Sequence, residues 1–202
     1  MRSRNSLAAL ITAGTLASIA ACGGPSHGTA SPTSPSDTAP ATSQNLAPKV
    51  DQPINNTSAV ETDPCSAVST ATVESAASKV KNSRTNTSNL GNTCVWIFDN
   101  SGGNVSAGVV TANKQGINAL YIQKSRGGLT TFKPQPPILG YPAVVYDNGG
   151  ETEGSCNLAV GIRDDVTYTV IAQLRHDSPV YSDACGMATK IASAAITHLK
   201  GQ

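Results

Sequence analysis

Apolar residues recur with two different periods along the C-terminal part of the chain, and these periods predict helices and strands. Val73, Ala76, Ala77 and Val80 share one helical face behind Ser69, a residue type that caps helix N-termini. In a later segment the apolar residues fall at every second position, which is typical of a half-buried strand. The predicted elements, in order, are a helix after Ser69, strands at 94–98 and 105–111, a helix at 115–124, strands at 143–146, 156–163 and 166–174, and a terminal helix.

This order predicts an α+β fold in which helices pack against an antiparallel sheet of about five strands. The element order would be α-β-β-α-β-β-β-α. We expect Ser178 and Pro179 to open the terminal helix, because proline suits the first helical position. The buried face of that helix would consist of Ala184, Met187, Ala188, Ile191, Ala195 and Leu199.

A proline-rich connector at 130–142 separates the second helix from the last three strands. A stiff apolar segment of this kind loses little entropy when a partner docks. One hypothesis is therefore that the connector rims a ligand groove or a partner surface. The alternative is a plain crossover strand that covers the edge of the sheet. The residues of the candidate surface are Phe132, Pro134, Leu139 and Tyr141.

Four cysteines in this part of the chain predict two disulfides. Cys65, Cys94, Cys156 and Cys185 are separated by 29, 62 and 29 residues, whereas zinc sites need closely spaced pairs. We favour a nested pairing, 65 with 185 and 94 with 156. The sequential pairing, 65 with 94 and 156 with 185, stays open.

The N-terminus has the features of an export signal. Arg2 and Arg4 precede an uncharged apolar run that is too short to span a bilayer, and residues 1–21 are therefore predicted to be a signal peptide. The run ends in Ile19-Ala20-Ala21-Cys22, which resembles the lipobox at which bacterial lipoproteins are acylated and cleaved. We expect a lipidated Cys22 and a protein held on the extracytoplasmic face of the cell membrane. An ordinary secreted protein is the alternative, and it would leave an odd cysteine.

The next segment predicts a tether. Of the 21 residues from 23 to 43, 19 are Gly, Pro, Ser, Thr or Ala, which offer little to bury. We expect residues 22–60 to form a disordered tether, with Ser and Thr beside Pro as a hint of glycosylation, and residues 61–202 to form the domain.

Charge excludes one class of partner. The 202-residue chain carries 13% charged residues and a net charge of +1, so it lacks the basic field that nucleic acid requires. The membrane, through the lipid anchor, and an envelope protein or a small ligand are the partners we expect.

No catalytic residue, metal site or cofactor is expected. His176 and His198 are assigned structural roles, and no known nucleophile or phosphate-binding motif occurs. The carboxylates of two loops are the one group with potential for glycosidase chemistry or calcium binding, but we favour solvated loops, since no third ligand spacing supports calcium. Trp96 is predicted to fill the core. The loop carboxylates are Asp147, Glu151, Glu153, Asp164 and Asp165.

Several short motifs together resemble a known family. They are Asp63-Pro64-Cys65, Ser69, Cys94-Val95-Trp96, Cys156 and Asp183-Ala184-Cys185-Gly186. This set, spread over residues 63–200, resembles the actinobacterial lipoproteins of domain of unknown function 3558 (DUF3558). The resemblance implies an envelope lipoprotein of a Gram-positive actinobacterium, and it supplies no catalytic residues. Thr70 and Thr72 stand where the family often has Pro and Glu, so the first helix lacks a capping box.

These observations favour a membrane-anchored extracytoplasmic lipoprotein that is a non-enzymatic binding or interaction module of the cell envelope. An accessory subunit of an envelope transporter or sensor is the alternative. An envelope hydrolase that uses the carboxylate loop is a third hypothesis.

Overall fold

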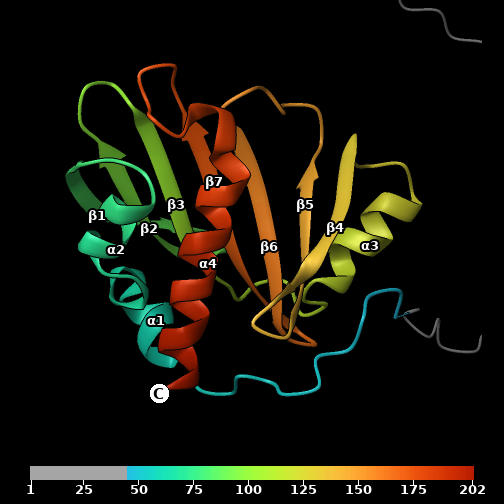
Figure 1. Ribbon diagram of the computed structural model, residues 1–202. Helices are drawn as coiled ribbons and strands as arrows, with labels where there is room; N and C mark the ends of the chain where they lie inside the picture. The colour runs from blue at the N-terminus through green and yellow to red at the C-terminus, as the bar shows by residue number, and fades with distance from the viewer. Residues whose placement is uncertain (1–44) are drawn as a thin grey trace, which may run out of the picture. The chain divides into compact units, whose positions relative to one another are not determined.

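One antiparallel sheet organises residues 45–202, the part of the chain that the computed structural model describes (Figure 1). The sheet has seven strands in the order β1-β2-β3-β7-β6-β5-β4. Hairpins connect most neighbours, and α3 lies between β3 and β4 in the chain. The strands are β1 (Val80–Ser88), β2 (Gly91–Phe98), β3 (Gly103–Val110), β4 (Thr131–Ile138), β5 (Tyr141–Asp147), β6 (Ser155–Arg163) and β7 (Val166–Leu174).

The prediction of about five strands was wrong, because two edge strands gave no strand signal in the sequence. After Val80, β1 is polar along its length, and its side chains are exposed. β4 contains Pro134, Pro136 and Pro137, which cannot donate to a ladder and are tolerated only at an edge. Val80, expected on the first helix, is the first residue of β1. The structure thus shows the proline-rich connector as a strand at the sheet edge.

Helices cover one face of the sheet, and this face holds the main core. α4 (Ala184–Lys200) crosses β6 and β7, while α1 (Ser58–Thr62), the 3₁₀ turn η1 (Pro64–Ala67) and α2 (Thr70–Ala76) lie over β1 to β3 (Figure 1). The six residues predicted to form the buried face of the terminal helix are all buried. Trp96 is buried among them, as expected.

A smaller helix packs on the other face. α3 (Asn118–Ser125) follows the buried residue Ile117, which contacts Val144 and Ala159 of β5 and β6. Gly161 of β6 leaves room for Ile117, because a Cβ there would lie 2.9 Å from the Ile117 side chain. The second predicted helix is therefore confirmed, and it covers only this half of the sheet.

The two disulfides are sequential, so the nested pairing was wrong. Cys65 of η1 bonds Cys94 of β2, and Cys156 of β6 bonds Cys185 of α4. In the sheet, β3 and β7 separate β2 from β6, which puts three strand spacings of about 4.8 Å each between Cys94 and Cys156. Disulfide-bonded Cα atoms lie within about 7 Å. Each bridge instead fastens the helical layer to the sheet.

Side-chain caps begin three of the six helical segments within residues 45–202, and the cap at Ser69 is where the sequence predicted it. Asp63 accepts a hydrogen bond from Cys65 N–H, and Ser69 accepts one from Thr72 N–H. The start of the last helix is an exception, because Ser178 and Pro179 belong to a turn before the 3₁₀ segment η2 (Tyr181–Asp183). α4 begins after Asp183, whose carboxylate accepts from Gly186 N–H at 3.1 Å.

The folded part begins earlier than residue 61. Residues 45–60, which we expected to continue the tether, pack against the end of the sheet where β6 turns into β7. Ile54 N–H donates to the Ile162 carbonyl at 2.9 Å, and the Tyr141 hydroxyl donates to the Gln52 carbonyl at 2.8 Å. Ile54 is also buried, so this segment adds to the core.

Candidate functional site

A hollow of about 490 Å³ lies at the end of the sheet where β2 turns into β3. It opens on strands β1, β2 and β3 and on the segment that follows β7. The described chain begins at the opposite end of the sheet, where Val50 N–H donates to Asp164 in the turn between β6 and β7 (Figure 1). The lining residues are Lys81, Ile97, Phe98, Asp99, Asn100, Ser101, Gly103, Asn104 and Arg175.

Local backbone irregularities build this hollow. In the pairing of β1 with β2, Lys81 is an extra residue, because Val80 opposes Phe98 and Asn82 opposes Ile97. A bulge of this kind re-aims a side chain, and here Lys81 lines the hollow.

The turn and the end of β7 complete the hollow. Asn100 and Ser101 adopt positive φ angles of 53° and 57° in the turn between β2 and β3. Arg175 N–H donates to the Gly102 carbonyl at 3.2 Å, which fixes the chain beside β3. Gly103 has a φ of +96°, and a Cβ there would lie 2.2 Å from the Gln173 carbonyl oxygen. Glycine is therefore required where the two strands meet.

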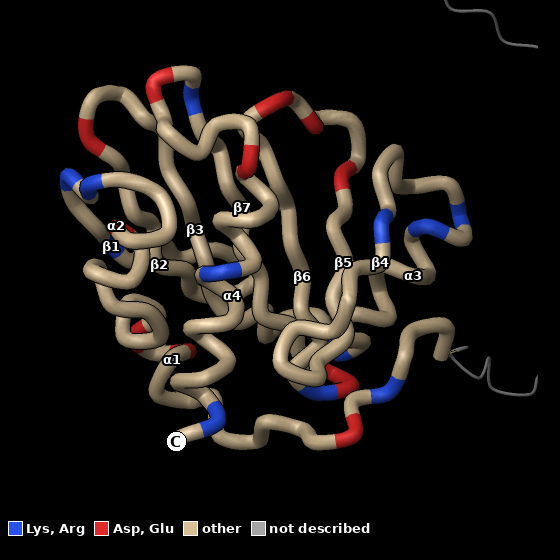
Figure 2. The backbone as a smooth tube through the Cα atoms, in the orientation of Figure 1, with Lys and Arg blue, Asp and Glu red and all other residues tan. Residues whose placement is uncertain are grey.

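The hollow contains two cations and one carboxylate. Lys81 and Arg175 have no ion-pair partner within residues 45–202, where the ion pairs are Lys133 with Glu151 and Arg163 with Asp165. Other acidic groups lie on loops at this end of the domain (Figure 2). The residues that line the hollow carry a net charge of +1, and the acidic residue Asp177 follows Arg175 by two positions in the chain.

The face of the sheet next to the hollow is open. Side chains on this face of β2, β3 and β7 alternate with the core residues and are half-buried rather than buried, among them Val95, Ile97, Ser106 and Ile171. Arg84 of β1 is opposite Val95 and is exposed. Such a mixture of aliphatic, hydroxyl and cationic groups is typical of an antiparallel sheet with one solvated face.

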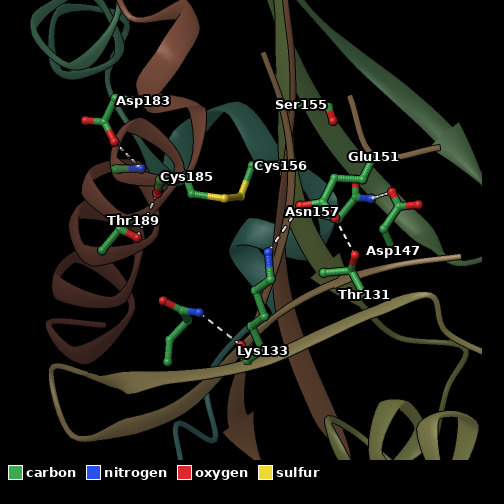
Figure 3. The surroundings of a disulfide bond; sticks show 12 residues. Thr131, Lys133, Asp147, Glu151, Ser155, Cys156, Asn157, Asp183, Cys185 and Thr189 are labelled. Carbon is green, nitrogen blue, oxygen red and sulfur yellow. Dashed lines mark hydrogen bonds and ion pairs between the residues drawn. A yellow bond between two sulfur atoms is a disulfide. The ribbon is translucent and has the colours of Figure 1, made fainter. Parts of the chain in front are cut away.

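The loop carboxylates are used mainly within the fold. Asp147 is buried and accepts hydrogen bonds from Gly149 N–H at 2.6 Å, Gly150 N–H at 2.5 Å and the Asn157 amide at 2.8 Å. Glu151 accepts from the Thr131 hydroxyl, and Lys133 Nζ lies 3.7 Å from its other oxygen (Figure 3). These contacts hold the loop between β5 and β6 against β4.

The second carboxylate loop is likewise engaged. Asp164 accepts from Val50 N–H at 3.0 Å, and Arg163 Nε donates to Asp165 at 2.5 Å. A second hollow, of about 390 Å³, lies beside the Cys156–Cys185 bridge, and Glu151, Glu153 and the helix-capping Asp183 line it. Within residues 45–202 no group of three His, Cys, Asp or Glu side chains is arranged to hold a metal ion.

Asp147 makes the stability of the fold sensitive to acid. The Gly149 N–H bond, followed by those from Gly150 and Asn157, holds the pKa of Asp147 below its ordinary value against the opposing effect of burial. The folded state lowers the pKa of Asp147, so its ionised carboxylate stabilises the fold. This stabilisation is fully present above the ordinary pKa of about 3.9 and is lost as the pH falls through the folded-state pKa.

We expect Asp147→Asn to lower the free energy of unfolding at pH 7 by about 2 kcal/mol. The hydrogen bonds to the Asp147 carboxylate would lose their charge, and the new side-chain amide would face the amide of Asn157. Urea unfolding between pH 7 and pH 2.5 checks this. The variant should also lose less stability than the wild type below pH 4. If the two proteins lost the same unfolding free energy below pH 4, the role of Asp147 in acid sensitivity would be contradicted. Glu153→Gln, in an exposed position of the same loop, is the control.

The proline-rich residues do not gather on one surface. Phe132 packs edge-on against Tyr121 of α3, with ring centroids 4.8 Å apart. Pro134 is exposed, and Leu139 sits at the exposed turn between β4 and β5. Tyr141 is buried on the other face of the sheet. Of the four residues proposed to form one ligand or partner surface, Leu139 and Tyr141 thus line one small hollow together, and Phe132 lies apart from them against α3.

Comparison with known proteins identifies the family. The family model described as protein of unknown function (DUF3558) matches residues 17–198. The chain belongs to the DUF3558 family. No curated protein and no solved structure matches the chain.

For this DUF3558 chain, the match extends upstream of the described domain, to residue 17. Cys22, the predicted lipidation site, therefore falls within the match but lies outside the described residues. Within residues 45–202, no helix is both long and apolar enough to cross a membrane.

Sequence reasoning missed the hollow of the DUF3558 domain. Lys81 lies in a polar segment that showed no strand signal, and its bulge depends on how β1 pairs with β2. Arg175 is 94 residues from Lys81 in the chain and belongs to none of the motifs described above. The Gly102-Gly103 pair was the one available signal, since consecutive glycines in a hairpin turn often mark a close backbone approach.

Proposed function

We propose that this DUF3558 protein is a lipid-anchored, extracytoplasmic binding module of the actinobacterial cell envelope. The observation that carries the proposal is the pairing of the cysteines. The four cysteines of the domain bond to one another, which leaves Cys22 as the one cysteine outside the two bridges. Cys22 directly follows Ile19-Ala20-Ala21, where a lipobox cysteine would stand.

The two disulfides also support export. Such bridges persist in oxidising compartments outside the cytoplasm and are rare in cytosolic proteins. Both bridges fasten helical segments to the sheet, so the fold depends on an environment in which they form. An acylated N-terminus would then hold the folded domain at the membrane surface.

The binding role rests on the open half of the sheet. The basic hollow lies at the end of the sheet opposite the start of the described chain at residue 45, and the open face of β2, β3 and β7 is next to it. The first described residues therefore do not line the hollow. That arrangement suits a module that contacts another envelope molecule.

The anchor is tested by the mass of the mature N-terminus. We expect the wild-type protein to begin at Cys22, to carry a diacylglyceryl group and to fractionate with membranes. Cys22→Ala should lack the acyl mass, whereas Ser26→Ala, four residues downstream, should be processed like the wild type. A wild-type N-terminus without acyl chains would overturn the proposal.

A further inference from the structure

Three leucines are the large hydrophobic side chains that remain exposed within residues 45–202. Leu46 is 43% exposed, Leu90 61% and Leu139 49%. Single apolar side chains on a surface need no explanation, whereas several at one place mark an interaction site. The positions of the three leucines in the fold therefore decide whether they act together.

Two of these leucines are at the tips of hairpins. Leu90 is in the two-residue turn between β1 and β2, and Leu139 is in the two-residue turn between β4 and β5. Because neighbouring strands run antiparallel throughout the sheet, both turns lie at the end where β6 turns into β7 (Figure 1). We call this end of the sheet the leucine end.

Leu46 is at the leucine end as well. Its N–H donates to the Asn118 side chain at 2.8 Å, at the start of α3. Two residues before Asn118, Gly116 is so close to the β6–β7 turn that a Cβ there would lie 2.5 Å from the Asp164 carbonyl oxygen. Val50 N–H also donates to Asp164. The described chain therefore begins at the leucine end.

Leu139 is an unusual residue for its turn. Its φ is 51°, and Gly140 follows with a φ of 91°. A two-residue hairpin turn with positive φ at both positions favours asparagine, aspartate or glycine, because a leucine side chain is strained there. This leucine thus strains the backbone and also exposes apolar surface to water. The turn does not account for it, whereas a partner that buries it does.

The spacing of the two turns fits a broad partner. Leu90 and Leu139 are on the two edge hairpins of the sheet, and five strand spacings separate the midpoints of those hairpins. At about 4.8 Å for each spacing, the tips are on the order of 24 Å apart. One small ligand cannot contact both tips, but a bilayer surface can.

Charge does not oppose contact of the leucine end with a membrane. Four cations and four acids lie at this end: Lys49, Lys114, Arg163 and Lys200, and Asp51, Glu61, Asp164 and Asp165. The loops at the opposite end, residues 99–102, 147–154 and 175–183, hold six acids and one arginine, and lysines of β1 and β4 offset part of that charge (Figure 2). Because an anionic lipid surface repels acidic groups, it favours the leucine end over these loops.

We propose that the leucine end docks on the surface of the phospholipid bilayer, with Leu46, Leu90 and Leu139 inserted among the lipids. This inference deepens the proposed lipid-anchored function and rests on it. Cys22 precedes residue 45 by 23 residues, and a chain of that length spans at most about 80 Å. The acyl anchor would therefore keep the leucine end within reach of the bilayer, and docking would leave the hollow between β2 and β3 facing away from it.

The test couples the protein to vesicles through Cys22. The four other cysteines are bonded to one another, so the mature chain, residues 22–202, carries one free thiol, which reacts with a maleimide on a phosphatidylethanolamine headgroup. The vesicles contain phosphatidylglycerol and phosphatidylcholine in equal parts, with a photoactivatable diazirine in the acyl chains of a small share of the lipid. Illumination and peptide mapping by mass spectrometry then show which residues enter the bilayer.

We expect crosslinks in the peptides that contain Leu46, Leu90 and Leu139, at about tenfold the frequency found in the Asn100–Ser101 turn at the opposite end. High salt should leave them in place, because the charges of the leucine end balance. Equal frequencies at the two ends, crosslinks confined to residues before 45, or crosslinks that high salt removes would each overturn the proposal.

Substitution of two leucines gives a readout at the third. In Leu90→Asn with Leu139→Asn, crosslinks at the unchanged Leu46 should fall about tenfold, because two apolar contacts with the lipid are lost. Asparagine suits the positive φ at position 139, so thermal unfolding should show an intact fold. The control is Ile97→Thr, a half-buried residue that lines the hollow, and it should leave the crosslinks unchanged. Unchanged crosslinks at Leu46 in the double variant would contradict docking through the turns.

A second copy of this chain is the other partner that could bury the leucines. Sedimentation of the uncoupled chain with Cys22→Ala should show a monomer. A dimer that the double leucine variant abolishes would assign the leucines to a protein interface and overturn the proposal. Because the coupling to lipid is chemical, failure of docking is distinguishable from failure of the Cys22 acylation experiment.

Discussion

Removal of both disulfides is expected to lower the free energy of unfolding by about 7 kcal/mol. Each bridge joins cysteines that are 29 residues apart, and closing a loop of that length stabilises a fold by about 3.5 kcal/mol in the chain-entropy model. Domains of this size are stable by about 5 to 15 kcal/mol in total. The doubly reduced protein should therefore be close to unfolding at 37 °C.

Paired substitutions measure this effect without leaving free thiols. Cys65→Ala with Cys94→Ala removes the bridge between η1 and β2, and Cys156→Ala with Cys185→Ala removes the bridge between β6 and α4. Urea unfolding of the two paired variants and of their combination should give losses that add, because the bridges join different elements. Unfolding free energies within about 1 kcal/mol of the wild type would contradict the prediction. Peptide mapping without reduction should recover the sequential pairs.

Gly103→Ala is expected to be the most damaging glycine substitution beside the hollow, with a loss of about 4 kcal/mol. Part of the loss is the cost of a φ of +96° for a residue with a Cβ, and part is the clash of that Cβ with the Gln173 carbonyl oxygen at 2.2 Å and with Leu174 Cα at 2.8 Å. Both neighbouring atoms belong to the backbone of β7. The clash can be relieved only by moving β3 away from β7.

Gly140→Ala is the matched control for the clash. Gly140 has a similar φ of +91°, but no atom lies within 4 Å of a Cβ built there. Its substitution should cost about 1 to 2 kcal/mol, the backbone contribution alone. Thermal unfolding of both variants isolates the steric part of the loss. Equal losses of unfolding free energy would show that the β7 backbone moves away from the new Cβ without a measurable cost.

Local patterns were sufficient wherever a segment has one buried face. In β7 every second residue is apolar, and in α4 apolar residues recur three or four positions apart, because each element packs one side on the core. Both elements were predicted from the sequence. The caps Asp63 and Ser69 were also predictable, since a cap is a contact between near neighbours in the chain. β1 and β4 were missed because an edge strand buries neither face fully, so its sequence carries no alternation.

The sequence by itself determined the number of disulfides, the buried face of the last helix, the α+β class and membership of DUF3558. Only the tertiary structure decided which cysteines pair, because the separation of β2 from β6 depends on strand order rather than on spacing in the chain. It also decided the candidate site. Lys81 and Arg175 meet at one hollow because β1 and β7 flank the β2–β3 hairpin, and strand order is set by the packing of the whole sheet rather than by any local pattern.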